Sequence, residues 1–218
     1  ESLDQQWDFE SDTVTRDTIL YAKWSQPVVG GIGEAGGYIF YENSNWEFDG
    51  WRYLEAAPYG WYEGSTDSNG AYSGDDDPVF HFGYHREINS NTNLFVGTAT
   101  NLGSGNTNTE LLVDAMGDEA YWTYGGDVKR MYAAKVCDTY SIVVDSQVYD
   151  DWFLPSKDEL IKMHQNLKQQ ELDSFSPGYY WSSSEFSEVS THAIFFGNIW
   201  ERTFSRYEDM TIRPVRAF

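Results

Sequence analysis

The sequence predicts an α+β fold in which strands come first, helices follow, and strands return at the end. Two observations lead to this prediction. Residues rich in β formers and alternating apolar side chains lie near both ends of the chain, whereas apolar residues at helical spacing lie in the middle. Elements that are segregated along a chain, instead of alternating as βαβ units, are typical of α+β domains.

The first 25 residues are expected to be a β segment that is separate from the main domain. Trp7 and Phe9 alternate with polar residues, and residues 18–24 read TILYAKW, a string rich in β formers. A glycine-rich junction follows at residues 26–37. No Lys-Ser or Lys-Thr pair ends this junction, which excludes a phosphate-binding loop. We therefore expect two units, residues 1–25 and residues 26–218.

The main domain is predicted to begin with two strands, at residues 38–41 and 51–57. Residues 58–105 then contain many Gly, Asn, Ser and Asp residues, which predicts a long loop-rich insertion. Short hairpins are expected within it, around residues 79–82 and 94–96. Loops of this length inside a compact domain are usually functional.

Three helices are predicted in the middle of the domain. Thr107 and Glu110 form a capping-box pattern before a helix at 108–116, and a second helical stretch covers 128–138. Cys137, the single cysteine, lies in this stretch as a small buried apolar residue.

The third helix has the strongest signal of the three. Ser156 and Glu159 form a second capping-box pattern directly after a proline, and apolar residues then repeat at helical spacing over 157–169. His164 lies on or beside that apolar stripe, where we expect a packing residue and not a metal ligand.

The last 40 residues are predicted to be strands at 179–184, 191–196, 199–204 and 211–215. Gly197 and Asn198 mark a hairpin turn between the second and the third of these strands. Arg213 and Arg216 in the last strand are expected to pair with internal carboxylates such as Glu55 or Glu185.

Six strings of the sequence, taken in order, resemble one known family. They are GGYIFY (36–41), GWRYLEAAP (50–58), GSGNTNT (103–109), DWFLPSKDEL (151–160), YWSSSE (180–185) and IRPVRAF (212–218). Over residues 30–218 the chain is similar to the Lcl C-terminal domain family, named for a collagen-like bacterial adhesin. The string at 18–24 resembles the end of the Listeria–Bacteroides repeat, a β module of bacterial surface proteins.

This resemblance implies a C-type-lectin-like fold, of the branch that includes formylglycine-generating-enzyme-like domains and the variable proteins of diversity-generating retroelements. It also implies a secreted or cell-surface adhesin module that binds a glycan or a surface protein and has no catalytic activity. Two alternatives stay open: a retroelement-diversified variable receptor domain, and a structural or oligomerising tip domain. In the diversified relatives, binding residues lie in the C-terminal third of the domain.

The matching stretch of this chain contains the candidate ligand-binding residues. They are Phe186, Glu188, Asn198, Trp200, Arg202, Tyr207 and Glu208. Trp, Tyr and Arg dominate binding hot spots, and Trp200 and Arg202, two apart on a strand, face the same side. The alternative is that Trp200 belongs to the core. A second candidate surface is the insertion at 59–100, with Trp61, Tyr62, Tyr72 and Tyr84; the alternative is that this insertion packs on the fold.

Composition excludes several classes of partner. Thirty-five acidic residues against 14 Lys and Arg give a net charge of −21, which repels nucleic acids and anionic membranes. No apolar run approaches the ~18 residues of a membrane-spanning helix, so we expect no membrane insertion.

Few residues indicate a metal or a catalytic site. Asp75, Asp76 and Asp77 are weak candidates for calcium, with a solvated acidic loop as the alternative, and no other cofactor is expected. His81 and His85 have helical spacing but no helical surroundings, which argues against a zinc site. The sequence contains no nucleophile elbow and indicates no particular carboxylate pair. An enzyme is therefore not expected.

Overall fold

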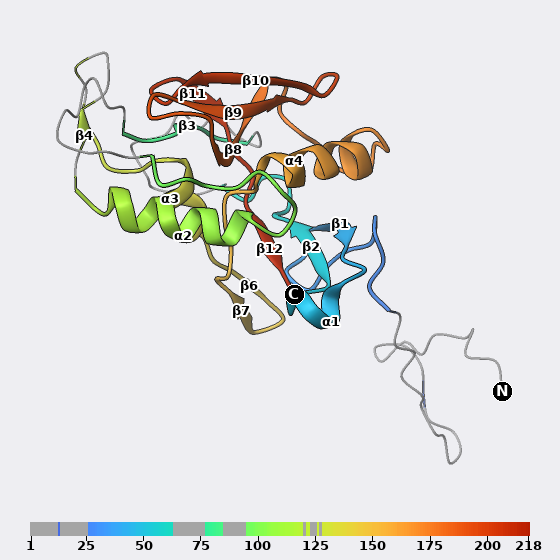
Figure 1. Cartoon of the computed structure of the whole chain (residues 1–218). Coiled ribbons are helices and arrows are strands. Elements are labelled where there is room, and N and C mark those ends of the chain that lie inside the picture. Colours follow the sequence, from blue (N-terminus) through green and yellow to red (C-terminus); the bar gives the residue numbers. More distant parts are fainter. Residues whose placement is uncertain are drawn as a thin grey trace.

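A computed structural model describes residues 13, 26–62, 77–84, 95–119, 121–122, 126 and 128–218. It confirms a mixed α+β architecture that consists mostly of sheets, with few helices (Figure 1). The β segment predicted before residue 26 lies outside the described residues, apart from Thr13.

The elements predicted from the sequence occur in the predicted order, but a short helix between the first two strands and two short strand pairs among the helices were not predicted. The helices are α1 (Trp46–Asp49), α2 (Gly105–Met116), α3 (Ala133–Asp138) and α4 (Lys157–Met163), which continues as the π-helical turn η1 (His164–Lys168). The strands are β1 (Tyr38–Glu42), β2 (Tyr53–Ala56), β3 (Val79–His81), β4 (Tyr121–Trp122), β5 (Val128–Lys129), β6 (Ile142–Val144), β7 (Gln147–Tyr149), β8 (Tyr179–Glu185), β9 (Ser190–Phe195), β10 (Trp200–Ser205), β11 (Asp209–Thr211) and β12 (Val215–Ala217).

Two sheets form the centre of the domain. The sheet β1-β2-β12 is antiparallel and brings the last strand beside the first two. The five-stranded sheet has the order β10-β9-β8-β11-β3, in which only β8 and β11 run parallel. Helix α4 contacts β8, β9 and β1, so it joins the two sheets, whereas α2 contacts β8 and α3 (Figure 1).

The two faces of β8 belong to two different hydrophobic clusters. Trp181 packs with Phe82 and other buried side chains in a cluster that includes residues of α2 and α3. Its neighbour Tyr180 packs with Phe196 in the cluster that contains Leu160 of α4. Successive strand residues point to opposite faces, so one strand contributes to both clusters.

The capping box at Ser156 is confirmed. The Ser156 Oγ accepts a hydrogen bond from the Glu159 amide (3.3 Å), and the Glu159 carboxylate accepts one from the Ser156 amide (2.7 Å). The box predicted at Thr107 is wrong, because α2 already begins at Gly105. The same Glu159 carboxylate accepts hydrogen bonds from amides at this helix start, Gly103 (2.8 Å) and Gly105 (3.4 Å). Glu159, a residue distant in sequence, therefore accepts hydrogen bonds from backbone amides at the start of α2.

Three further predictions need correction. The helix predicted at 128–138 covers only Ala133–Asp138, because residues 128–129 pair with β4. The strand predicted at 211–215 is divided into β11 and β12, which join different sheets on either side of Arg213 and Pro214. The hairpin predicted at 79–82 is a single strand, β3, that pairs with β11.

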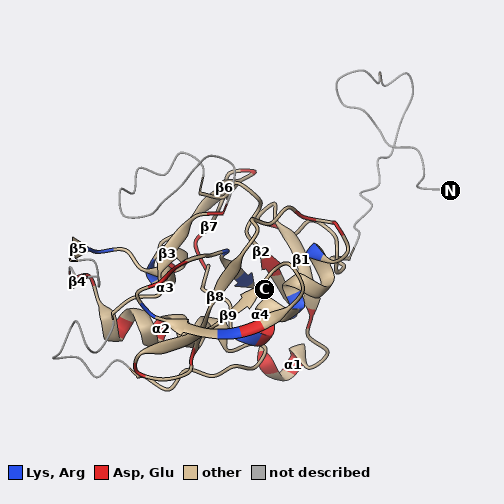
Figure 2. Cartoon of the chain, turned by 90° about the horizontal axis from the view of Figure 1, so that it is seen from above, with Lys and Arg blue, Asp and Glu red and all other residues tan. Residues whose placement is uncertain are grey.

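The acidic residues of α1 and α2 lie on the outside of the domain. Glu47, Asp49, Glu110 and Asp114 are all exposed, and both helices show red segments in Figure 2. This arrangement leaves much of the negative charge in contact with solvent, where it favours solubility.

Candidate functional site

The β9–β10 hairpin presents Trp200 at the edge of the five-stranded sheet. Its turn contains Ile199 with a φ of 55°, a left-handed conformation that is rare for a β-branched residue. The Ile199 amide donates to the Phe195 carbonyl (3.0 Å), which closes the turn. Backbone strain of this kind persists only where the surrounding structure supports it.

Trp200 and Arg202 lie on the same face of β10, as predicted. They are paired with Phe195 and Ala193 of β9. The side chain of Trp200 is 57% exposed, so the alternative that Trp200 belongs to the core is wrong. Arg202 is exposed as well.

Three half-buried aromatic residues support this face, and none of them was among the predicted site residues. The ring of Tyr179 lies 5.0 Å from that of Phe195 and 4.7 Å from that of Phe204. Tyr179 and Phe195 precede or follow the buried Tyr180 and Ile194 on β8 and β9, an alternation of period two that is visible in the sequence. Trp200, Arg202, Tyr179, Phe195 and Phe204 are called the β10 face below.

The other predicted residues lie away from Trp200, except Asn198, which is exposed in the same turn. Phe186 and Glu188 belong to the β8–β9 loop, and Tyr207 and Glu208 to the β10–β11 turn. The Arg206 amide donates to the Val189 carbonyl (3.2 Å), so these two loops lie together. Strand β10 separates them from the β9–β10 turn.

Phe186 lies on the opposite side of the sheet from Trp200. Its ring is 60% exposed and 5.5 Å from the ring of His192, a residue paired with Thr203 on the other face of β10. The His192 Nδ1 lies 2.9 Å from a carboxylate oxygen of Glu201. Burial lowers the pKa of His192, and Glu201 opposes this effect. The predicted residues therefore form two separate surfaces.

A buried ion pair positions the β8–β9 loop. Glu185, at the end of β8, pairs with Arg206, and both side chains are fully buried. The Glu185 carboxylate also accepts hydrogen bonds from the amides of Val96 and Gly97, each 3.0 Å long. Residues 95–98 are thereby attached to the sheet.

Asp77 belongs to the interior and not to a calcium site. Arg213 donates to both of its carboxylate oxygens (2.6 and 2.9 Å), while Trp61 and Tyr180 each donate to one (3.0 and 2.6 Å). Each Asp77 oxygen already accepts two hydrogen bonds, so the lone pairs of the carboxylate are used within the protein. Asp75 and Asp76 lie outside the described residues. Among the residues that are described, no three His, Cys, Asp or Glu side chains are grouped so that they could bind a metal ion.

The three named aromatic residues of the second candidate surface that the structure describes pack on the fold, which was the alternative for this insertion. Trp61, Tyr62 and Tyr84 are buried in the cluster around Trp181. Edge-to-face contacts of Trp61 with Tyr62 and Tyr140, at 5.2 and 5.0 Å, account for their burial. Tyr72 lies outside the described residues.

The pairing predicted for the two C-terminal arginines is confirmed in part. Arg216 donates to Glu55 (3.2 Å), as expected, and also to Asp151 (2.9 Å). Arg213 instead pairs with Asp77 and Asp173, and Glu185 pairs with Arg206.

The other two predictions for single residues agree with the structure. Cys137 is fully buried, and burial raises the pKa of its thiol. His164 is buried against the ring of Phe196 at 5.2 Å, and burial lowers its pKa.

No family model matches this chain, and no curated protein matches it in sequence. Within the described part of the chain, no helix combines the length and the apolar character that crossing a membrane requires.

Proposed function

We propose that this chain is a secreted or cell-surface adhesin module with a C-type-lectin-like fold, similar to the Lcl C-terminal domain, and that it recognises a protein partner through the β10 face. The exposed Trp200 on an edge strand is the observation that carries this proposal. An exposed tryptophan beside an arginine and half-buried aromatic rings has the composition of a binding hot spot.

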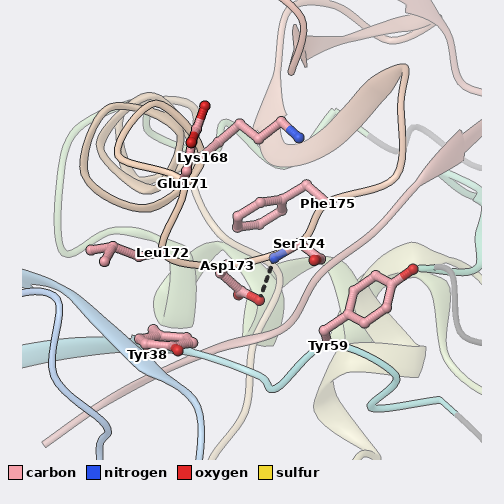
Figure 3. Close-up of a pocket in the computed structure, with 8 residues that line it drawn as sticks. All are labelled: Tyr38, Tyr59, Lys168, Glu171, Leu172, Asp173, Ser174 and Phe175. Atoms are coloured by element: carbon pink, nitrogen blue, oxygen red, sulfur yellow. Dashed lines mark hydrogen bonds between the residues drawn. The ribbon is translucent and has the colours of Figure 1, made fainter.

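The residue types of the β10 face favour a protein over a glycan. Aromatic residues and arginine are enriched in protein–protein interfaces, whereas a small ligand needs a concave site. None of the five residues lines the hollow that Tyr38, Tyr59 and Phe175 help to form (Figure 3). Among the strands that the structure describes, β10 lies at the end of its sheet, and such an edge can pair with a partner.

Two features of the fold support the C-type-lectin-like assignment. Early strands, helices and a hairpin-rich C-terminus follow one another in the order that this fold has, and β12 returns to pair with β2. The retroelement-diversified alternative is favoured by one observation: all seven candidate residues are at least partly exposed, whereas Trp181 and Arg213 beside them are buried.

The test is a binding screen of the chain and its Trp200→Ala variant against surface proteins and glycans, with and without calcium. Loss of a hot-spot tryptophan costs about 2 kcal/mol or more, so the variant should bind its protein partner roughly thirtyfold more weakly. Trp46→Ala is the matched control, because Trp46 is 42% exposed on α1, away from β10 in Figure 1. Equal affinity of the Trp200→Ala variant and the unmodified chain would rule out the β10 face.

A further inference from the structure

The hairpin of β6 and β7 projects from the domain on the side away from β10 (Figure 1). Asp145 and Ser146 connect its strands with φ values of 50° and 69°, and two left-handed central residues are what a type I′ turn requires. Among the described strands, neither β6 nor β7 pairs with any third strand. An isolated two-stranded hairpin is only marginally stable in water, so contacts with the domain are needed to hold this one in place.

One face of the hairpin packs on the domain and the other faces solvent. Ile142 and Tyr149, which are paired with each other, are half-buried against the cluster that includes residues of α2 and α3. The Trp152 indole also donates to the Tyr149 carbonyl (3.0 Å). Val143 and Val148 form the next pair on the opposite face, where they are 65% and 52% exposed. The hairpin thus presents a pair of apolar β-branched side chains to solvent.

A hollow of about 670 Å³ lies beside this apolar pair, within the size range of ligand sites. It is separate from the hollow of Figure 3 and is lined by Glu34, residues 147–151 and Arg216. Val148 belongs both to the apolar pair and to the lining. The apolar pair and the hollow therefore form one continuous surface.

Negative charge dominates the hollow. Glu34, Asp150 and Asp151 are exposed carboxylates of its lining, whereas Arg216 supplies the positive charge. Arg216 donates to both oxygens of Asp151 (2.9 and 3.1 Å) and to the buried Glu55 (3.2 Å), so its guanidinium is already shared. Glu34 lies 3.9 Å from the same guanidinium. Even without Glu55, three carboxylates stand against one guanidinium, and an excess of negative charge remains.

This surface fits a basic protein segment better than other occupants. Among the described residues, no three acidic, His or Cys side chains are grouped so that they could bind a metal ion. A second copy of this chain, with its net charge of −21, would be repelled. A lysine or arginine next to an apolar side chain matches both the carboxylates and the valine pair.

We propose that the β6–β7 hairpin and the hollow beside it dock a basic segment of a partner protein, an extended stretch in which Lys or Arg stands two residues from an apolar side chain. Residues two apart on an extended chain share one face. The basic side chain enters the hollow beside Glu34 and Asp150, where it forms charge-assisted hydrogen bonds, and the apolar one covers Val143 and Val148. This docking site does not rest on the β10 face.

The test is fluorescence anisotropy of a labelled heptapeptide, KSVSKSV with blocked ends, titrated with the whole chain. We expect a dissociation constant below ~1 mM at low salt, and affinity that falls as salt is added, because exposed charges are screened. The acidic peptide ESVSESV should not bind. KSSSKSS, which lacks the apolar residues, should bind several-fold more weakly.

Matched variants of the chain locate the site. Glu34→Gln with Asp150→Asn should weaken KSVSKSV binding roughly fivefold or more, because the hollow loses two carboxylates. The control is Glu119→Gln with Glu208→Gln, which removes two exposed charges outside the hollow and should weaken binding about twofold or less.

The apolar part has its own pair of variants. Val148→Thr keeps a β-branched side chain but makes it polar, so it should weaken KSVSKSV binding roughly threefold. Val128→Thr, at a valine of β5 that is 49% exposed, should leave binding unchanged.

Three results would overturn the inference: KSVSKSV does not bind, KSSSKSS binds equally well, or the two double variants weaken binding equally. Equal weakening would mean that the peptide responds to net charge alone. Trp200→Ala should leave peptide binding unchanged. This inference and the proposal for the β10 face can therefore fail separately.

Discussion

Three buried glutamates accept hydrogen bonds from backbone amides of loops that are distant in sequence. Glu55 binds the amides of Ala35 and Gly37, at 3.1 and 2.8 Å. Glu185 binds the amides of residues 96–97, and Glu159 those of residues 103, 105 and 156. Each carboxylate satisfies buried donors that would otherwise cost free energy, so each fixes a loop to the framework.

Glu159→Gln should lower the free energy of unfolding by about 1–3 kcal/mol. Both oxygens of Glu159 accept from amide donors, so the NH₂ group of a glutamine would have to face one of these donors. Urea denaturation followed by circular dichroism measures the change. Glu208→Gln, at an exposed position, is the control and should stay within ~0.5 kcal/mol of the unmodified chain.

The effect of Glu159→Gln should also depend on pH. Burial raises the pKa of Glu159 to about 7 from its ordinary value of 4.5. A pKa that is raised in the folded state adds stability below the unfolded pKa, and this stability is lost as the pH rises through the folded value. The advantage of the unmodified chain over the variant should therefore be largest near pH 4.5 and decline toward pH 7. A difference that is constant across this window would contradict the expected shift.

At the scale of single elements, turns and helix ends place the candidate sites. Ile199 in the β9–β10 turn precedes Trp200, and Glu171 follows the π-helical turn that extends α4. Both residues have left-handed backbone conformations that cost of order 1–2 kcal/mol for a side chain with a Cβ atom. Ile199 thus adjoins the β10 face, and Glu171 lies in the loop after η1.

Glu171→Gly should raise the free energy of unfolding by roughly 0.5–1 kcal/mol, because relief of the left-handed strain exceeds the extra entropy of glycine in the unfolded chain. Glu171→Ala removes the same carboxylate without relieving the strain, so it is the matched comparison. Thermal unfolding measures both variants. Equal stability of the two variants would show that position 171 is not strained.

At the scale of the whole molecule, Arg213 connects segments from across the sequence. The buried guanidinium binds Asp77 and Asp173 and donates to the carbonyls of Ala57 (2.9 Å) and Ser174 (2.7 Å). Burial lowers the pKa of Arg213, but the combined effect of Asp77, Asp173 and Tyr180 is larger, so the pKa is raised. The β1-β2-β12 sheet, β8 and the loop after η1 thus share one charged centre.

Arg213→Met should destabilise the fold by about 3–5 kcal/mol, since it leaves the Asp77 carboxylate buried without its partner. Adding Asp77→Asn should recover part of this loss, because the double variant buries no unpaired charge at position 77. Arg202→Met, at an exposed arginine, is the control for loss of positive charge. Denaturant midpoints of the unmodified chain, Arg213→Met, Asp77→Asn and the double variant test the coupling, which strictly additive losses would disprove.

Local patterns in the sequence determined the type and order of most elements. The capping box at Ser156, the alternation at Tyr180 and Trp181, and the turn at Gly197 depend only on neighbouring residues, so they could be read from the chain. The shared face of Trp200 and Arg202 followed from the same alternation, whereas the exposure of Trp200 did not, because the sequence left a core position open.

Only the tertiary structure decided which distant groups meet. It assigned Asp77 to Arg213, Glu159 to the start of α2, and Trp61 to the core, because each of these outcomes depends on a partner far away in the sequence. It also placed Phe186 and Trp200 on opposite faces of one sheet. Periodicity reports on one element at a time, whereas burial, ion pairing and the shape of a hollow result from how the elements pack.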